Sequence, residues 1–304
     1  MIRTIHNIPN NVCNVNYLVK IPDQRRIFQK ILHTAHAAVF EVHRTFSLIG
    51  PALRYQFNKC IDYVKPPTQK NGVIAYDTAS FPWNADKNTS SAGLYVFIHG
   101  LRGTPLTWEK YRKQVHQTQP GVHCFVPQVY RRGNCPLKEA ADPILVAIQD
   151  YAKKHPGKTI YLVGVSHGAL IAAYLERKLS LENTPIKLAS IAGVHFGTKI
   201  VDKFFKLHLQ KLTGLHPLVA ETFRYGNAKA MKRLDNWRIF AKGPHAACTR
   251  IFYATTEDDR VRNVESALPK IGDSDQHYFI HGHSHNSIVN AVRDHVLKNL
   301  SAKN

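Results

Sequence analysis

The chain has 304 residues, a length that buries an ample hydrophobic core and predicts one large domain, or one domain with an appendage. Its 44% hydrophobic and 20% charged residues are typical of a globular protein. The charge is less usual, because 41 Lys and Arg against 21 Asp and Glu give a net charge of +20, which favours attraction to nucleic acid or to an anionic membrane surface.

The sequence also bears on location. No apolar stretch is long enough to span a bilayer, and residues 1–7 lack the apolar core of a secretory signal. The cysteines are scattered, odd in number and without a CxxC pair, which favours reduced thiols over a disulfide framework. We therefore expect a cytoplasmic or peripheral membrane protein. Export by a route that reads no N-terminal signal stays open.

Residues 1–70 predict an N-terminal helical extension. Asp23 is suited to cap a first helix, whose apolar residues recur every three or four positions until Gly50. A second run with the same spacing ends at Pro66. A helical hairpin packed on the main domain explains this pattern. A helix that lies on a membrane or binds a partner is the alternative, because residues 1–70 contain ten Lys or Arg and three acidic residues.

From residue 71 onward, short apolar or β-branched runs alternate with helical patterns. The predicted strands are Val73–Tyr76, Leu94–Ile98, His123–Pro127, Thr159–Val163, Lys187–Ile191 and Ile251–Ala254. The predicted helices are Lys138–Lys154, Ala169–Leu179 and Ile288–Leu300. This alternation predicts an α/β fold, with a mostly parallel sheet and helices on both faces. In such folds the functional residues lie at the carboxyl ends of the strands.

The strand Thr159–Val163 leads directly into the sequence GVSHG, residues 164–168, and then into a helix. A G-x-S-x-G turn between a strand and a helix is so sharp that glycine is needed two positions before and two after the serine. The serine is held in a strained conformation with its hydroxyl exposed at the tip of the sheet. Ser166 is therefore the predicted nucleophile, and a surface serine in an ordinary turn is the alternative.

A second strand end supplies hydrogen-bond donors. The strand Leu94–Ile98 is followed by HGLRG, residues 99–103, whose backbone N–H groups we expect beside the nucleophile. Acyl transfer needs two donors where negative charge develops on the tetrahedral oxygen, and we assign them to the amides of Leu101 and His167. We expect His99 to be a buried structural histidine whose ring takes no part in the chemistry.

These two motifs together resemble those of the α/β-hydrolase superfamily, on its lipase and esterase side. A third segment, Gly193–Thr198, is similar to the P-H-x-G-[ST] sequence of many lipases, although valine replaces the proline. The resemblance covers residues 73–300 and leaves residues 1–70 unmatched. It implies a hydrolase domain over residues 71–304, in which a serine, an acid and a histidine follow one another along the chain.

The resemblance indicates where the acid lies. In related hydrolases the acid follows the strand that corresponds to Ile251–Ala254, two residues before an apolar residue. This spacing selects Asp259, two residues before Val261, with Asp258 as the second choice. The acid holds the histidine in the tautomer that accepts the serine proton. A solvated acidic turn is the alternative.

Three histidines alternate in the segment Ile280–Ile288. His285 is the first choice for the catalytic base, because the family histidine opens a final helix with an aliphatic residue three positions on, here Ile288. His283 is the second choice. Histidines two apart share one face of a strand and suit a metal, but no obvious Cys or carboxylate set accompanies them, so we expect no metal.

Residues 199–250 form an insertion that is too long for a simple crossover. Positions 199–242 contain ten Lys or Arg and three acidic residues, interspersed with apolar residues such as Phe204 and Phe205. In lipases such an insertion forms a cap or lid over the acyl pocket, and the resemblance implies the same here. A helical excursion with solvated lysines is the alternative.

The sequence therefore predicts a lipase- or phospholipase-like serine hydrolase that cleaves a lipid or another acyl ester and needs no cofactor. The basic, apolar insertion favours an anionic membrane surface as a partner. Nucleic acid is a less favoured partner, because no nucleic-acid motif with interleaved aromatic residues is present. Two alternatives stay open: an acyl-thioesterase of the depalmitoylase kind, and a non-catalytic basic protein that binds membranes or nucleic acid on a hydrolase scaffold.

Overall fold

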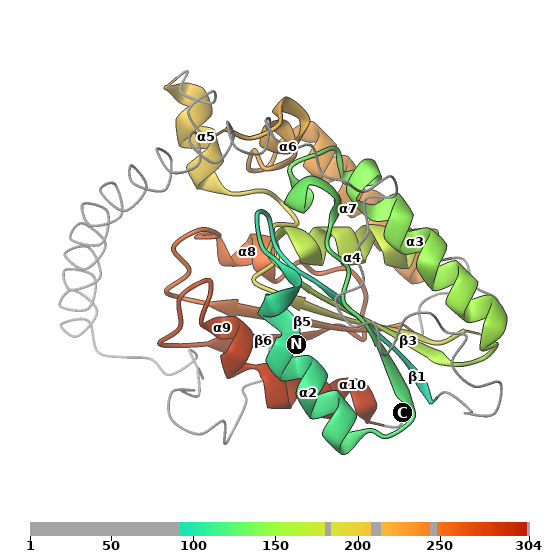
Figure 1. Cartoon of the computed structure of the whole chain (residues 1–304). Coiled ribbons are helices and arrows are strands. Elements are labelled where there is room, and N and C mark those ends of the chain that lie inside the picture. Colours follow the sequence, from blue (N-terminus) through green and yellow to red (C-terminus); the bar gives the residue numbers. More distant parts are fainter. Residues whose placement is uncertain (1–91, 180–183, 208–213, 244–247, 303–304) are drawn as a thin grey trace, which may run out of the picture.

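The computed structural model describes residues 92–179, 184–207, 214–243 and 248–302 (Figure 1). The predicted helical extension, residues 1–70, and the predicted strand Val73–Tyr76 lie outside these ranges. The strands are β1 (Gly93–Ile98), β2 (Val122–Phe125), β3 (Thr159–Val165), β4 (Ile186–Ile191), β5 (Thr249–Thr255) and β6 (Gln276–Ile280). The helices before β4 are η1 (Pro105–Trp108), α2 (Glu109–Thr118), η2 (Tyr130–Gly133), α3 (Leu137–Lys154) and α4 (His167–Lys178). Those after β4 are α5 (Lys199–Lys206), α6 (Pro217–Thr222), α7 (Ala228–Lys242), α8 (Val264–Ala267), α9 (Ile288–Ala291) and α10 (Arg293–Ser301).

The six strands form one sheet in the order β2-β1-β3-β4-β5-β6, and every neighbouring pair is parallel. Because all six strands run in the same direction, their carboxyl ends lie along one edge of the sheet. The structure thus confirms the predicted α/β fold.

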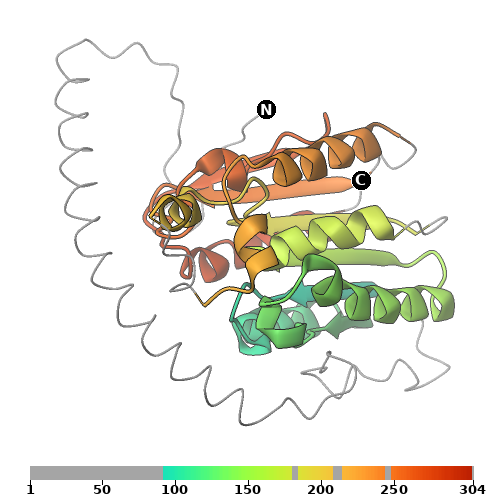
Figure 2. The same ribbon diagram turned by 90° about the horizontal axis from the view of Figure 1, so that it is seen from above.

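Alternate side chains of the strands enter two separate cores. In β1, Leu94, Val96 and Ile98 face the layer formed by α3, α4 and α7. Tyr95 and Phe97 face the layer formed by α2, α9 and α10. This alternation follows from the two-residue period of a strand. Figure 2 shows α3, α4 and α7 side by side over one face of the sheet.

The predicted elements within the described ranges are present, with ends shifted by one or a few residues. One differs, because the chain turns at Val292 and divides the predicted final helix into α9 and α10. Five elements outside the insertion were not predicted: η1, α2, η2, α8 and β6. Among the ten residues of α2 only Tyr111 and Val115 are buried, so its apolar periodicity is weak.

A buried ion pair joins α4 to β5 beneath α7. The guanidinium Nη2 of Arg250 lies 2.7 Å from Glu176 Oε1, and the indole N–H of Trp237 donates to Glu176 Oε2 at 2.7 Å. Both charged side chains are almost completely buried. Each partner therefore depends on the other, since loss of one would leave an uncompensated charge in the core.

The insertion between β4 and β5 contributes α5, α6 and α7. A small apolar cluster attaches its first part to the carboxyl edge of the sheet, where Val201 and Phe223 pack with Leu170 and Val194. The helix α7 lies instead on the face of the sheet, beside α4 (Figure 2). None of the helices in the described ranges has the length and apolar character needed to cross a membrane.

Candidate active site

Ser166 lies at the sharp junction of β3 and α4. Its backbone has φ 55° and ψ −120°, a conformation that residues other than glycine rarely adopt. The two motif glycines are needed here for steric reasons: a Cβ on Gly164 would overlap the carbonyl of Gly168, and one on Gly168 would overlap the carbonyl of Ile98. The Ser166 N–H donates to Ile191 O at 2.9 Å. The predicted turn is therefore formed, and it presents a partly exposed serine at the carboxyl edge.

The loop after β1 passes directly beside this serine. A Cβ built on Gly100 would lie 3.1 Å from Ser166 Cβ, which places the following amide, that of Leu101, close to the predicted nucleophile. In this loop the Arg102 N–H donates to Arg132 O at 2.7 Å, whereas no backbone hydrogen bond of the described loops uses the Leu101 N–H. His167 is the first residue of α4, so its N–H has no acceptor within the helix. The two predicted oxyanion donors thus flank Ser166 without competing backbone acceptors.

An unusual turn supports the Leu101 loop. Arg131, Arg132 and Gly133 have φ values of 47°, 51° and 79°, so three consecutive residues adopt a left-handed conformation. The guanidinium of Arg132 donates from Nε to Gly103 O at 3.3 Å and from Nη2 to Arg102 O. These supporting residues were not predicted, and Gly133 was their only local signal in the sequence.

His99 has the structural position expected of it. Its Nε2 accepts the Val129 N–H at 3.1 Å, so Nδ1 carries the proton and donates to Gly100 O at 2.8 Å. Burial lowers the pKa of His99 to about 4. The ring is therefore neutral at physiological pH, and it joins the end of β1 to the chain that follows β2.

The structure pairs His285 with Asp258. The Nδ1 atom of His285 lies 2.9 Å from Asp258 Oδ1 and 2.8 Å from Oδ2, and both side chains are buried. The expectation that Asp259 would contact the histidine is therefore wrong. Asp259 follows in a half-buried position, and the second choice, Asp258, holds the imidazole.

Local backbone geometry explains this difference. Asp258 Oδ1 accepts the N–H of Arg260 at 2.8 Å and that of Val261 at 2.6 Å. An aspartate that accepts from residues two and three positions ahead turns its side chain back over its own loop. The carboxylate that faces the protein interior is therefore three residues before Val261, and not two as the spacing in related hydrolases predicted.

The alternate histidines have separate partners. The His283 carbonyl accepts from the Thr255 hydroxyl at 2.7 Å, and its Nδ1 lies 3.5 Å from Ser287 Oγ. His281 Nδ1 lies 3.2 Å from Thr256 Oγ1. Among the residues that the structure describes, no group of three or more His, Cys, Asp or Glu side chains is arranged to hold a metal.

The structure brings Asp258 and His285 together and holds Ser166 at the same edge of the sheet. Within the described ranges, no hydrogen bond joins the Ser166 hydroxyl to His285. Catalytic hydrogen bonds of this kind are often long before a substrate binds. The serine turn and the Asp–His pair are thus two preformed parts of one candidate site.

The segment Gly193–Thr198 connects the site to the insertion. The Thr198 hydroxyl donates to Arg260 O at 2.6 Å, and its backbone N–H donates to Phe223 O at 2.8 Å. His195 is buried, with Nε2 2.8 Å from Ser190 Oγ, and burial lowers its pKa to about 3. This lipase-like segment therefore has a structural role here, because it anchors the start of α5 to the loop that carries Asp258.

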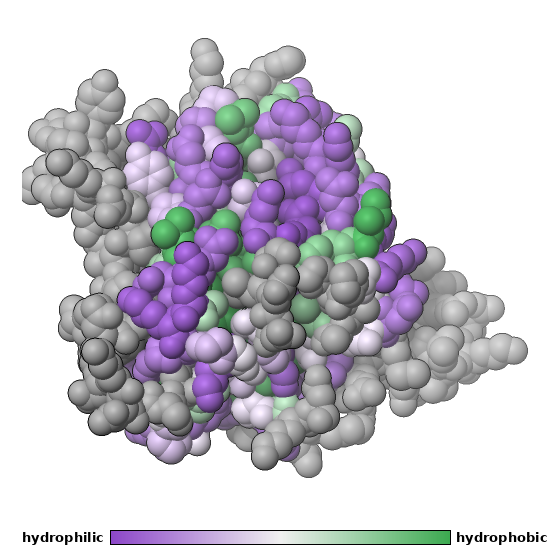
Figure 3. All heavy atoms as spheres, turned by 90° about the vertical axis from the view of Figure 1, so that its right-hand side faces the viewer, coloured by the Kyte–Doolittle hydropathy of each residue, from purple (hydrophilic) through white to green (hydrophobic). Residues whose placement is uncertain are grey.

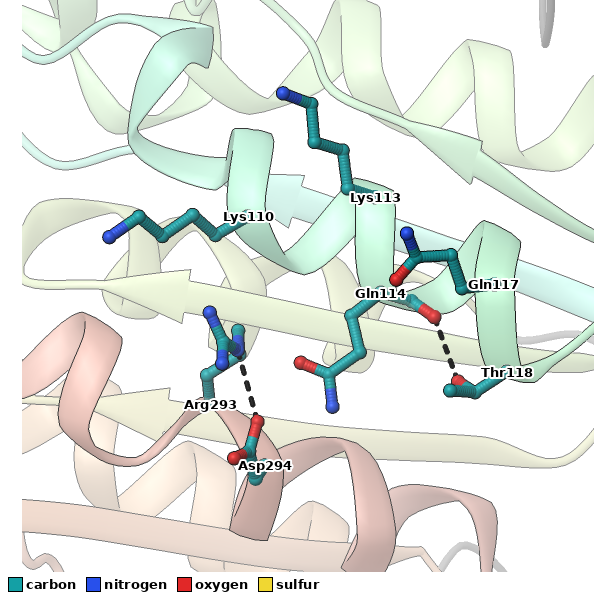
Figure 4. Close-up of a pocket in the computed structure, with 7 residues that line it drawn as sticks. All are labelled: Lys110, Lys113, Gln114, Gln117, Thr118, Arg293 and Asp294. Carbon is teal, nitrogen blue, oxygen red and sulfur yellow. Dashed lines mark hydrogen bonds and ion pairs between the residues drawn. The ribbon is translucent and has the colours of Figure 1, made fainter.

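A shallow pocket between α2 and α10 lies apart from this site. It is lined by Lys110, Lys113, Gln114, Gln117, Thr118, Arg293 and Asp294 (Figure 4). Lys113 is paired with Glu109 at 2.9 Å, and Arg293 with Asp294 at 3.0 Å. The Thr118 hydroxyl donates to the backbone of its own helix. None of the predicted site residues lines the pocket, so we assign it no catalytic role.

Comparisons with known proteins bear on the fold. No family model matches the chain, and no curated protein matches it. A solved structure of Bacillus licheniformis lipase BlEst2 in its mature form superposes with a TM-score of 0.53 at 12% identity, covering 77% of this chain and 100% of that one. One from a study of LipS and LipT, two metagenome-derived lipolytic enzymes, gives 0.51 at 12% identity, covering 70% and 94%. At such identities the similarity establishes the fold alone.

Proposed function

We propose that this chain, which has the α/β-hydrolase fold, is a serine hydrolase of carboxylic esters. In this proposal Ser166 is the nucleophile, His285 is the general base and Asp258 is the acid that orients the base. The strained backbone of Ser166 is the observation that carries it, with φ at 55° between a parallel strand and a helix. Such strain persists only where the surrounding structure enforces it, and it is concentrated at functional sites.

The arrangement supplies each group that acyl transfer needs. The Ser166 oxygen attacks the acyl carbonyl while its proton passes to Nε2 of His285, whose Nδ1–H remains bonded to Asp258. The negatively charged oxygen of the tetrahedral intermediate accepts hydrogen bonds from the backbone N–H groups of Leu101 and His167. Collapse of the intermediate breaks the bond to the alcohol, which leaves with the proton from His285. Water, activated by the same imidazole, then hydrolyses the acyl-enzyme.

We propose a lipid ester, of the lipase or phospholipase kind, as the substrate. Several large apolar side chains of the insertion are solvent-exposed, including Leu207 at 64%, Leu218 at 50% and Met231 at 39%. Leu207 follows α5 and Leu218 lies in α6, the two helices that the apolar cluster joins to the carboxyl edge of the sheet, whereas Met231 lies on α7. Exposed apolar groups over a hydrolytic site favour an acyl chain over a small polar ester.

We also propose that α5 rests on an anionic membrane surface. Lys203 and Lys206 are exposed on this helix, and the partly buried Phe204 and Phe205 lie between them. Phe205 packs against the apolar cluster and under Arg224, so the exposed side of α5 is formed by Lys203 and Lys206, three positions apart, with Phe204 partly exposed beside them. A cationic side of this kind suits the headgroup region of an anionic bilayer. Such docking would place a lipid substrate close to the carboxyl edge of the sheet.

The decisive experiment is Ser166→Ala. Hydrolysis of a short p-nitrophenyl ester and covalent labelling by a fluorophosphonate should both be lost, because the alanine has no oxygen to attack with. Circular dichroism and the thermal midpoint should stay close to wild type, since the backbone conformation at this position is unchanged. Near wild-type turnover in this variant would refute the mechanism.

The same assay separates the alternatives. A wild-type protein that neither labels nor turns over any ester would point to a non-catalytic scaffold that binds membranes or nucleic acid. A thioester of the same acyl chain, followed by release of the free thiol, tests the acyl-thioesterase alternative. A clear preference in kcat/KM for the thioester would replace the ester in the proposal, and Ser166 would keep its role.

A further inference from the structure

Two arginines meet behind the serine turn, where α4, α7 and the end of α6 converge. Arg177, in the last turn of α4, donates from Nε to Ala173 O at 3.3 Å and from Nη1 to Arg233 O at 3.4 Å. Arg233, in the middle of α7, donates from Nη2 to Thr222 O at 3.3 Å. Backbone carbonyl oxygens thus hold both side chains in place between the helices that Figure 2 shows side by side.

The described residues offer this pair only a partial counter-charge, because the charge of Glu176 raises the pKa of Arg177 against the larger effect of burial. Within the described ranges neither Arg177 nor Arg233 forms an ion pair. The adjacent Glu176 is already engaged by Arg250 and Trp237. The Nε of Arg233 is buried without an acceptor. Two half-buried cations are therefore held next to each other, with donor capacity left over.

The electrostatic consequences are visible in the neighbouring groups. Burial, with a smaller contribution from the charge of Arg177, lowers the pKa of Arg233 to about 10. Burial also lowers the pKa of Arg177. Both guanidinium groups therefore remain charged at neutral pH. The charge of Arg233 also adds to the burial that lowers the pKa values of His167 and His195.

Like charges that are buried together destabilise a fold unless a counter-charge binds between them. A guanidinium presents a planar fork of donors that matches the oxygens of a carboxylate or a phosphate, and two such groups can hold one oxyanion from two sides. The carbonyl contacts use only some of the five N–H donors of each group.

We propose that Arg177 and Arg233 form a binding site for an oxyanion, a phosphate or carboxylate group, which bridges α4 and α7. The site lies beside Thr222 and Phe223, and Phe223 packs edge-on against His167, with ring centroids 5.0 Å apart. An anion bound there fastens the insertion to the helix that follows Ser166. This site is independent of the proposed ester hydrolysis.

Thermal unfolding of the full-length protein tests the site. The protein is prepared in a chloride buffer free of phosphate and sulfate, and inorganic phosphate is added at constant ionic strength. The unfolding midpoint should rise with the phosphate concentration. At a phosphate concentration of ten times the Kd, the equilibrium constant for folding should be about tenfold higher than without phosphate. Chloride at equal ionic strength should give no such rise.

The variants separate this site from general attraction of anions to a chain of charge +20. Arg233→Met and Arg177→Met should each abolish the phosphate-dependent rise. In phosphate-free buffer each should unfold at or above the wild-type midpoint, because one of two repelling charges is gone. Arg233→Lys should keep only a weak response, since it lacks the planar fork. The control Arg238→Met, which removes an exposed arginine paired with Asp235 on the same helix, should respond as wild type does.

Butyl phosphate distinguishes the two sources of the anionic group. If butyl phosphate raises the midpoint and inorganic phosphate does not, the site receives the anionic group of an organic ligand. If inorganic phosphate suffices, a free anion is the ligand. The proposal is overturned if neither compound raises the midpoint, or if both arginine variants respond as strongly as wild type. In that case the hydrogen bonds to backbone carbonyl oxygens would be sufficient to hold the two arginines in place.

Discussion

Ser166 and Ala192 share a conformation that few residues of their type adopt, with φ values of 55° and 48°. They end the neighbouring strands β3 and β4, and the backbone bond from Ser166 N to Ile191 O joins the two turns. Strain at such positions costs about 1–3 kcal/mol, which the surrounding packing must offset. In Ser166 this cost serves to project a hydroxyl out of the sheet.

Replacing Ser166 with glycine should therefore stabilise the fold while abolishing activity. Glycine reaches positive φ without steric strain, but it also has a larger entropy in the unfolded chain. After that cost is subtracted, we expect the free energy of unfolding to rise by about 1 kcal/mol. Chemical unfolding measures this gain. The control Ala147→Gly, within α3, should instead lose about 1 kcal/mol. A loss at Ser166→Gly similar to that of the control would contradict the strain argument.

Adjacent aspartates give a second residue-scale test. Asp258→Asn should lower kcat for a soluble ester by about 10³- to 10⁴-fold, because the amide stabilises the wrong imidazole tautomer. Asp259→Asn should retain activity within a few-fold of wild type, since that side chain does not contact His285. Steady-state kinetics at pH 8 provide the comparison, and equal losses in the two variants would remove the acid role from Asp258.

At the scale of elements, α5 is the segment most suited to lie on a membrane. Thr198 caps its first turn and also holds the Asp258 loop through Arg260 O, so the base of α5 is fixed to the candidate site. Its outer side carries the exposed Lys203 and Lys206. A third lysine of the insertion, Lys211, lies outside the described residues.

Charge reversal on α5 should weaken vesicle binding. Each cation near an anionic bilayer contributes on the order of 1 kcal/mol, so Lys203→Glu with Lys206→Glu should lower partitioning onto phosphatidylserine vesicles by more than about tenfold. Sedimentation of the vesicles measures it. Lys153→Glu with Lys154→Glu, at the end of α3, serves as the matched control and should have little effect.

Hydrolysis of a soluble ester should be unchanged in both double variants, because none of the four lysines belongs to the candidate site. Added salt should weaken wild-type binding without eliminating it, because the aromatic contribution is not screened. Equal binding of the wild type to neutral and anionic vesicles would exclude a docking role for the lysines of α5.

At the scale of the whole molecule, each face of the sheet has its own hydrophobic core. Several histidines are buried beside these cores, in the sheet and in the loops. The face that includes α3 is mainly hydrophilic, with small separate apolar spots (Figure 3). Among the described residues, three of the five buried histidines have strongly lowered pKa values: burial lowers the pKa of His99 to about 4 and those of His167 and His195 to about 3. All three are therefore neutral in the folded protein near neutral pH.

This burial predicts a steep loss of stability in acid. Above pH 6.5, the ordinary pKa of histidine, folded and unfolded chains are both neutral at these positions. Below it the unfolded chain binds protons that the folded chain does not, so stability is lost as the pH falls from about 6.5 towards 4. Three such groups give a slope approaching about 4 kcal/mol per pH unit. Urea unfolding between pH 7.5 and 5 checks this, and a flat profile would contradict it.

The strained turn at Ser166 could be predicted from the sequence because its cause is local. Two glycines, a serine and the flanking strand and helix lie within a few residues, and steric contacts over that distance leave one conformation. The same holds for the parallel sheet, since an alternation of strands and helices is compatible with few topologies. For β6 and α2 the residue pattern was too weak, and contacts with the rest of the sheet determine them.

Only the tertiary structure decided between Asp258 and Asp259, because the direction of the carboxylate depends on two backbone N–H groups of the following turn. It also brought Arg177 and Arg233 together, although they are 56 positions apart in the chain. Sequence spacing carries no information on such encounters, because they arise when helices pack on a common sheet. The sequence by itself therefore determined the fold and the position of the strained serine, and packing determined which charged groups lie around it.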